Sequence, residues 1–313
     1  MAVAAQGKPP QVAPTRTKTQ EVLYRMRREW TAYVFLAPGL ILFAIFTVFA
    51  VVYSFYLSFH EWNVLEPMKP FVFLDNYARL LTDARFHRAV LNTIFYTVLS
   101  VPLTMMAGLL IALLLNTGVK MRGLYRTLYY IPNITPLVVA AIIWKWVYQG
   151  DYGLLNYYLR QIGLIDSPIL WLSDPNLAMP AVILMSVWGG AGYHMVIYLA
   201  GLQAIPEDYY DAAKVDGANL LQQFRHITFP LLSPTTFFLL ITSIIGSFQI
   251  FTQIYIMTNG GPLGRTSTIG FYLYEKAFRQ FQMGYASAMS YALFAMIFIF
   301  TLLQLRYMRQ DVT

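Results

Sequence analysis

The chain has 313 residues, of which 58% are hydrophobic and only 12% are charged. Soluble domains carry roughly 25% charged residues, so this composition excludes an ordinary soluble protein and indicates a membrane protein. The sequence contains no cysteine, which excludes a disulfide framework, a thiolate metal site and a cysteine nucleophile. The formal net charge is +7, and in a membrane protein the placement of Lys and Arg matters more than their sum.

Residues 1–32 precede the first apolar run. Residues 1–20 contain three prolines and no hydrophobic periodicity, which is typical of a disordered tail. From Glu21 to Trp30, three arginines alternate with apolar residues, and this pattern predicts a basic juxtamembrane helix facing anionic headgroups.

Six apolar runs are long enough to cross a bilayer, because a helix needs roughly 20 residues to span the hydrocarbon core. The first run is too long for a cleaved signal peptide, whose apolar region has about 7–15 residues. The sequence therefore predicts an all-α membrane protein with one six-span domain over residues 33–313. The six runs are 33–59, 89–116, 124–149, 178–203, 235–258 and 286–308.

The first loops contain short amphipathic stretches. Residues 60–88 predict a surface helix before the second span, and residues 150–165 predict a turn followed by a second surface helix. Pro132 and Pro136 lie early in the third span, and we expect them to kink it. Lys145, near the end of that span, is interpreted as a side chain that reaches the interface rather than as part of an ion pathway.

Polar side chains interrupt the fourth and fifth spans, where lipid would penalise them. Trp188, Tyr193 and His194 belong to the run WGGAGYH, whose small residues allow helices to approach closely. His194 is either a functional residue or a neutral histidine bonded across a helix interface. Gln249 and Gln253 are four residues apart, which places them on one helical face. We predict that these five residues line a pathway through the bundle.

A polar segment, residues 206–234, separates the fourth and fifth spans. It reads PEDYYDAAKVDGANLLQQFRHITFPLLSP. Its opening proline at the first helical position and the acids that follow predict a short helix, which Gly217 ends. A second short helix is expected from about Asn219 to Phe229, where Pro230 stops it. The predicted product is a projecting pair of short helices.

The run DAAKVDGANLLQQFRHITFPLLSP resembles the cytoplasmic signature loop of the membrane permeases of bacterial ATP-binding cassette (ABC) importers. That pattern has an acid, two alanines, three free positions, a glycine and a downstream proline pair. Asp211 stands where the family most often has glutamate, and it keeps the charge. The resemblance implies a coupling helix that seats in a groove on the ATPase subunit, rather than a connector without a partner. The docking residues that it implies are Asp211, Ala212, Ala213, Asp216, Gly217, Ala218, Pro230 and Pro234.

Two further stretches resemble the carbohydrate branch of the same family. They are Phe71–Asn76 with Asn92 and Thr93, in and after the first long loop, and the glycine-rich turn Thr258–Pro262 before the last span. The chain has no G-x-x-x-x-G-K-[ST] motif and no paired-histidine zinc motif. We therefore expect no cofactor in this chain, with ATP and Mg bound by the partner ATPase subunits.

The resemblance implies a permease for a sugar or related polyol, acting with a second homologous permease, two ABC ATPase subunits and an extracytoplasmic solute-binding protein. Placing both termini in the cytoplasm of a bacterial inner membrane puts 13 of the 22 basic residues inside, in agreement with the positive-inside rule. An ion-coupled secondary carrier is the alternative. It would need intramembrane acids, and the predicted spans contain no Asp or Glu. No catalytic motif occurs, so we predict a transport subunit rather than an enzyme.

Overall fold

The computed structural model describes residues 19, 24 and 28–308, and contacts divide the chain into two units, Met1–Ser54 and Phe55–Thr313. The tail and basic helix predicted over residues 1–30 lie mostly outside the described residues. In the first unit, α2 (Trp30–Phe43) continues through a π-helical segment, η1 (Ala44–Phe49), into α3 (Ala50–Ser58), which crosses the boundary. Together they form one helix of 29 residues that is apolar enough to span a membrane.

The second unit is organised around two long helices, α5 (Ala84–Asn116) and α9 (Ala178–Gln203), which pack extensively against each other. A third long helix, α16 (Met283–Met308), ends the described chain. Two bent pairs complete the spans: α6 (Arg122–Ile134) with α7 (Leu137–Val147), and the helical segment Leu220–Leu231 with α13 (Ser233–Phe248). Over the described residues this gives four unbroken spans, or six when each bent pair counts as one. The all-α fold with up to six spans was predicted.

The third span breaks more sharply than a kink. Its two helices meet at 94°, around Thr135 and Pro136. Thr135 has an extended conformation (φ −68°, ψ 129°), as expected for a residue before proline. Pro136 cannot donate a backbone hydrogen bond, so the helical ladder ends there.

The prediction of one helix over residues 235–258 is wrong. α13 ends at Phe248, and a new short helix, α14 (Thr252–Met257), begins after a three-residue break. The Thr268 hydroxyl donates to the carbonyl of Ile250 in the break at 3.1 Å. That hydrogen bond satisfies a backbone group that has left the helical ladder, which makes the break tolerable inside a membrane protein.

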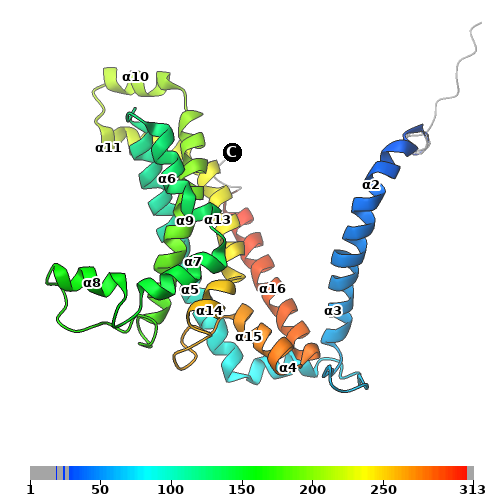
Figure 1. Ribbon diagram of the computed structural model, residues 1–313. Coiled ribbons are helices and arrows are strands. Elements are labelled where there is room, and N and C mark those ends of the chain that lie inside the picture. Colours follow the sequence, from blue (N-terminus) through cyan, green and yellow to red (C-terminus); the bar gives the residue numbers. More distant parts are fainter. Residues whose placement is uncertain (1–18, 20–23, 25–27, 309–313) are drawn as a thin grey trace, which may run out of the picture. The chain divides into compact units, whose positions relative to one another are not determined.

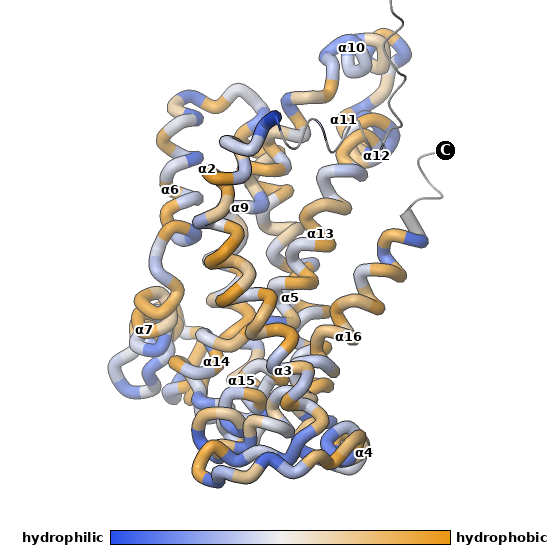
Figure 2. Tube along the Cα trace, turned by 90° about the vertical axis from the view of Figure 1, so that its right-hand side faces the viewer, coloured by the Kyte–Doolittle hydropathy of each residue, from blue (hydrophilic) through white to orange (hydrophobic). Residues whose placement is uncertain are grey.

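Polar elements gather at the two ends of the second unit. One end, which we call the α10 end, carries α10 (Glu207–Val215), α11 (Leu220–Gln223), η2 (Phe224–Thr228) and α12 (Phe229–Leu231) (Figure 1). The opposite end, the α4 end, carries α4 (Asp75–Thr82) and α15 (Ile269–Tyr274), which leads into η3 (Glu275–Arg279). Figure 2 shows hydrophilic residues concentrated at these ends, with hydrophobic residues between them. The surface helices predicted in the first loops are confirmed as α4 and α8 (Leu154–Gln161).

Glycines set the spacing of the central helices. A Cβ atom at Gly192 on α9 would overlap the carbonyl oxygen of Tyr129 on α6, and one at Gly108 on α5 would overlap the Cβ of His194. A Cβ at Gly190 would lie 2.9 Å from Thr104 Cγ2. The close helix approach predicted from WGGAGYH is therefore confirmed.

Candidate functional site

A cavity of about 480 Å³ lies between α5, α9 and the two broken spans. We call it the central cavity, and its volume is typical of ligand pockets, which measure about 300–1,000 Å³. Both helix breaks contribute to its wall. Irregular backbone at membrane depth is tolerated where it lines such a cavity. Its polar lining residues are Ser100, Thr104, Asn133, Thr135, Ser186, His194, Ser243, Ser247, Gln249, Thr252 and Gln253.

His194 is buried, and both ring nitrogens have partners. Nδ1 lies 2.9 Å from the carbonyl oxygen of Gly190, and Nε2 lies 2.8 Å from Ser243 Oγ on α13. A carbonyl can only accept, so Nδ1 carries a proton, whereas the serine hydroxyl can donate to Nε2 or accept from it. His194 is therefore bonded across the interface between α9 and α13, and its ring also borders the cavity.

The other four predicted pathway residues divide into two groups. Gln249 and Gln253 line the cavity, but the predicted reason is wrong, because the helix breaks between them. Trp188 and Tyr193 do not line it. The Trp188 ring packs edge-on against Trp144 of α7, with centroids 5.6 Å apart, and Tyr193 packs beside the cluster of buried residues that includes Met195 and Leu199.

Sequence reasoning missed four hydroxyl residues of the cavity lining. Ser100, Thr104, Ser186 and Ser243 are hydroxyl residues inside apolar helices, and their only signal is that they are small and polar. Such residues commonly return their hydroxyl to a carbonyl one turn back, as Thr104 does to Ser100 at 2.7 Å. The sequence therefore does not distinguish them from other small polar residues within a helix. Only the packing of the neighbouring helices shows that they line the cavity.

The predicted docking segment forms capped helices. Glu207 and Asp208 lie in the first turn of α10, and Pro206 is its N-cap rather than its first residue. Gly217, at φ +79°, ends α10 as predicted. Its backbone amide donates to the carbonyl of Lys214 at 3.0 Å, and the backbone amide of Ala218 donates to the carbonyl of Ala213 at 2.9 Å. This is the hydrogen-bond pattern of a Schellman motif.

The second helix begins with a capping box. The Asn219 side chain accepts from the Gln222 amide at 2.9 Å, and the Gln222 side chain accepts from the Asn219 amide at 2.8 Å. The prediction that Pro230 stops this helix is wrong, because the helical segment runs from Leu220 to Leu231. The π-helical η2 just before Pro230 relaxes the ladder that the proline interrupts. The bend of 62° follows Leu231.

Internal contacts hold this segment together. The Gln223 amide donates to the carbonyl of Ala218 at 2.8 Å, and the Tyr210 hydroxyl lies 3.0 Å from Thr228 Oγ1. Lys214 forms an exposed ion pair with Asp211 at 2.9 Å, and this partner raises the pKa of Lys214. The segment is therefore a preformed structure.

Several apolar side chains of the segment are exposed and make little contact with the rest of the chain. Val215, Leu220 and Leu221 are 89%, 83% and 74% exposed. The residues implied for docking are also at the surface or close to it. Six of them, from Asp211 to Ala218, cluster on α10 and its C-cap, whereas Pro230 and Pro234 lie on α12 and at the start of α13.

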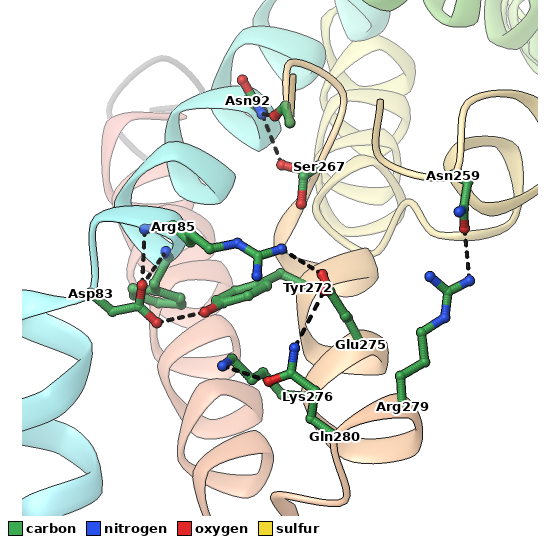
Figure 3. Close-up of polar contacts among 12 residues, drawn as sticks. Asp83, Arg85, Asn92, Asn259, Ser267, Tyr272, Glu275, Lys276, Arg279 and Gln280 are labelled. Atoms are coloured by element: carbon green, nitrogen blue, oxygen red, sulfur yellow. Dashed lines mark hydrogen bonds and ion pairs between the residues drawn. The ribbon is translucent and has the colours of Figure 1, made fainter. Parts of the chain in front are cut away.

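At the α4 end, Asp83 joins three helices (Figure 3). One carboxylate oxygen caps α5 by accepting the amides of Arg85 and Phe86. The other accepts the hydroxyls of Tyr272 on α15 at 2.7 Å and Tyr285 on α16 at 2.6 Å. Burial alone would raise the pKa of Asp83, but these four hydrogen bonds hold it below its ordinary value.

Basic residues surround this aspartate. Arg85 forms an ion pair with Glu275 at 2.8 Å. Lys276 donates to Gln280 at 2.9 Å and lies over the ring of Tyr272, while burial and the nearby Arg79 lower the pKa of Lys276. We call Asp83 with Tyr272 and Tyr285 the Asp83 cluster. It fixes the start of α5 to α15 and α16.

Asn92 and Thr93, which carried part of the sequence resemblance, also join segments distant in the chain. The Asn92 amide donates to the carbonyls of Gly264 and Ser267 at 2.9 Å each. Thr93 Oγ1 accepts the amide of Ile269, the first residue of α15, at 3.0 Å. Both residues therefore hold the turn before α15 against α5.

Comparisons with known proteins agree with this architecture. Residues 84–309 match the family model described as "Binding-protein-dependent transport system inner membrane component". The chain is 40% identical over 275 residues to the probable ABC transporter permease protein YesP of Bacillus subtilis, covering 87% of this chain and 88% of that protein. It is 35% identical over 291 residues to the trehalose/maltose transport system permease protein MalF of Thermococcus litoralis, covering 92% and 96%.

The chain is also similar to a lactose permease and to an alginate importer of known structure. The lactose transport system permease protein LacF of Rhizobium radiobacter is 36% identical over 276 residues, covering 87% of this chain and 92% of that protein. The fold matches the crystal structure of a bacterial ABC transporter that imports alginate, with a TM-score of 0.81 and 24% identity over 93% of this chain and 99% of that one. The permease prediction is confirmed over the secondary carrier. This chain belongs to the family of binding-protein-dependent transport system inner membrane components, the permeases of ABC importers.

Proposed function

We propose that this permease imports a sugar or related polyol. Relatives named for trehalose and maltose, lactose, and sulfoquinovosyl glycerol support this substrate class. The central cavity supports it as well, because its polar groups are hydroxyls, amides and one histidine, and no Asp, Glu, Lys or Arg among the described residues lines it. Such donors and acceptors suit sugar hydroxyls.

The observation that carries the proposed mechanism is the exposed apolar surface of the docking segment. Val215 lies beside the glycine that ends α10, and Leu220 and Leu221 follow the capping box of α11, so a partner would bind them without first ordering the chain. Large exposed apolar residues on an otherwise polar element mark a protein interface. The partner in this proposal is an ABC ATPase subunit, and a pair of these subunits would bind ATP and Mg, while this chain binds no cofactor.

The docking segment leads directly to the central cavity. The helix Leu220–Leu231 continues through its bend into α13, and α13 supplies Ser243 and Ser247 to the cavity wall. Movement of the ATPase subunits would therefore shift one wall of the cavity. Alternating access results if the ATPase subunits contact this segment differently in their two states, because only differential contacts shift an equilibrium.

This mechanism places the α10 end and both termini in the cytoplasm of a bacterial inner membrane. The α4 end would then face the solute-binding protein. A second homologous permease would supply the other half of the pathway. The distribution of Lys and Arg supports this orientation.

Val215→Glu tests the docking role, because Val215 makes little contact within its own chain. The variant should insert normally, fail to copurify with the ATPase subunit in detergent, and lose ATP-dependent uptake of radiolabelled maltose, trehalose and lactose by cells carrying the whole importer. Leu263→Glu is the matched control for copurification, since Leu263 is 79% exposed but lies outside the docking segment. Copurification and uptake at the wild-type level in Val215→Glu would contradict the proposal.

A further inference from the structure

A second cavity, of about 410 Å³, lies apart from the central cavity. We call it the mouth cavity. Its walls are the end of α7 with the turn after it, the loop residues 170–173, and the turn 257–262. The loop precedes the first turn of α9, and the last turn of α9 leads to α10. The mouth cavity is therefore at the α4 end of the molecule.

Two short helices connect the cavities. α7 and α14 pack against each other, and both begin at the central cavity and end at the mouth cavity. Leu137 and Thr252, their first residues, line the central cavity. Tyr148 and Thr258, which directly follow their last residues, line the mouth cavity. Along α7, Ala140 lines the central cavity and Lys145 lines the mouth cavity, and at 1.5 Å per residue these two positions are roughly 7.5 Å apart.

The mouth cavity presents free polar groups. Lys145 Nζ donates to the carbonyl of Ile256 at 3.3 Å, and within the described chain it has no carboxylate in ion-pair range, so two of its donors remain. The side chains of Gln149 and Asp151 are exposed, and neither makes a hydrogen bond to any described residue. A lysine, a glutamine and an aspartate thus line one hollow.

This set of groups matches the chemistry of a saccharide. Vicinal hydroxyls donate and accept hydrogen bonds at once, so they pair with the carboxylate of Asp151, the amide of Gln149 and the ammonium of Lys145. A hollow of this volume encloses a small ligand, whereas a docking surface for a protein would not require one. The hydrogen bond from Lys145 to α14 also holds its ammonium beside the cavity, which the interface interpretation does not explain.

We propose that the mouth cavity is a saccharide-binding subsite, which receives the sugar from the binding protein before it passes along α7 and α14 to the central cavity. This inference rests on the proposed sugar import and on the outward orientation of the α4 end. It assigns Lys145, Gln149 and Asp151 to substrate recognition, and it gives the importer two successive sites on one chain.

Cysteine labelling tests occupancy directly, because the native chain has no cysteine. Gln149→Cys in the complete importer would be labelled in spheroplasts with a membrane-impermeant maleimide, and this chain then purified. The control is Gln161→Cys, at an exposed position on α8 outside the cavity. Maltose, trehalose or lactose, whichever the wild type imports, should slow labelling of Gln149→Cys at least threefold when added with the binding protein. Labelling of Gln161→Cys should not change.

Sugar-free binding protein provides the decisive comparison. If the binding protein slows labelling of Gln149→Cys equally with and without sugar, the protection comes from a protein contact and the subsite is overturned. Labelling that is not slowed at all would also overturn it. Protection that requires sugar supports it.

Uptake kinetics give a second measure. Asp151→Asn and Lys145→Gln should each raise the KM for uptake about five- to tenfold through lost hydrogen bonds, with unchanged copurification of the ATPase subunit. Asp166→Asn, at an exposed acid outside the cavity, should leave KM unchanged. Unaltered KM in both cavity variants would overturn the subsite while sugar import stands. If the wild-type importer takes up no sugar or polyol, the proposed function fails first.

Discussion

Single residues decide how closely the central helices pack. Gly189 and Gly192 are three positions apart on α9, yet an added Cβ meets nothing within 4 Å at Gly189 and overlaps the carbonyl of Tyr129 at Gly192. Backbone cannot move aside as a flexible side chain can. A substitution at Gly189 can therefore serve as the control for the same substitution at Gly192.

We expect Gly192→Ala to force α6 away from α9, to cost about 1–3 kcal/mol of stability, and to impair transport because α6 supplies Asn133 to the central cavity. Gly189→Ala should fold at least as well as the wild type, since alanine favours helix. Thermal denaturation in detergent measures both variants. Equal denaturation midpoints for the two variants would contradict the close contact at Gly192.

The Asp83 cluster gives a second prediction at this scale. Asp83→Asn removes the charge that strengthens the hydrogen bonds from Tyr272 and Tyr285, and it should lower stability by about 1–3 kcal/mol at neutral pH. The folded pKa of Asp83 is lowered, so its stabilisation is complete above the unfolded value of about 3.9 and disappears as pH falls through the folded value.

The difference in denaturation midpoint between wild type and Asp83→Asn should therefore be constant at neutral and weakly acidic pH and shrink only in stronger acid. A difference that grows on acidification would show that Asp83 has the opposite linkage.

Elements were predicted from sequence wherever the signal is local. Long apolar runs located the spans. Pro132 and Pro136 together predicted a kink in the third span, and the break occurs at Pro136, whereas Pro132 lies within α6. Gly217 located the end of α10, and the small residues of WGGAGYH located the close helix contact. The break between α13 and α14 could not be predicted, because its sequence, QIF, contains no proline or glycine. The group that stabilises it, the Thr268 hydroxyl, lies 18 residues further along the chain.

The same reason explains which cavity residues were found. Gln249 and Gln253 stand out because amides are rare in lipid-facing positions. Trp188 and Tyr193 were misplaced because an aromatic residue in a span looks the same whether it packs on a neighbour or faces a pathway. The residues of the mouth cavity come from three distant segments, and only the fold brings them together.

Thr268→Val tests the break between α13 and α14. The variant keeps the shape of Thr268, which is fully buried, but leaves the Ile250 carbonyl without its partner, at a cost of about 1–3 kcal/mol. Because Gln249 and Gln253 flank this carbonyl, the KM for sugar uptake should rise. Thr242→Val removes a comparable hydroxyl bond within α13 and should have little effect. Identical KM values for Thr268→Val and Thr242→Val would show that the break does not depend on Thr268.

At the scale of the whole molecule, this permease combines two cavities with a docking segment that lies at the far end of the same helices. In the proposed mechanism, the energy for transport enters from the ATPase subunits at the docking segment. The helix Leu220–Leu231 and α13 provide a continuous route from the docking segment to the central cavity.

The most direct test of this account is crosslinking from the docking segment. Ala212 is exposed on α10, and Ala212→Cys would be the only cysteine in the chain. With a short bifunctional reagent in inside-out membrane vesicles of cells that carry the whole importer, we expect a crosslinked product containing this permease and the ATPase subunit, with a yield that changes on addition of ATP. Crosslinking that joins Ala212→Cys only to other partners, or that requires access from the opposite side of the membrane, would contradict the account.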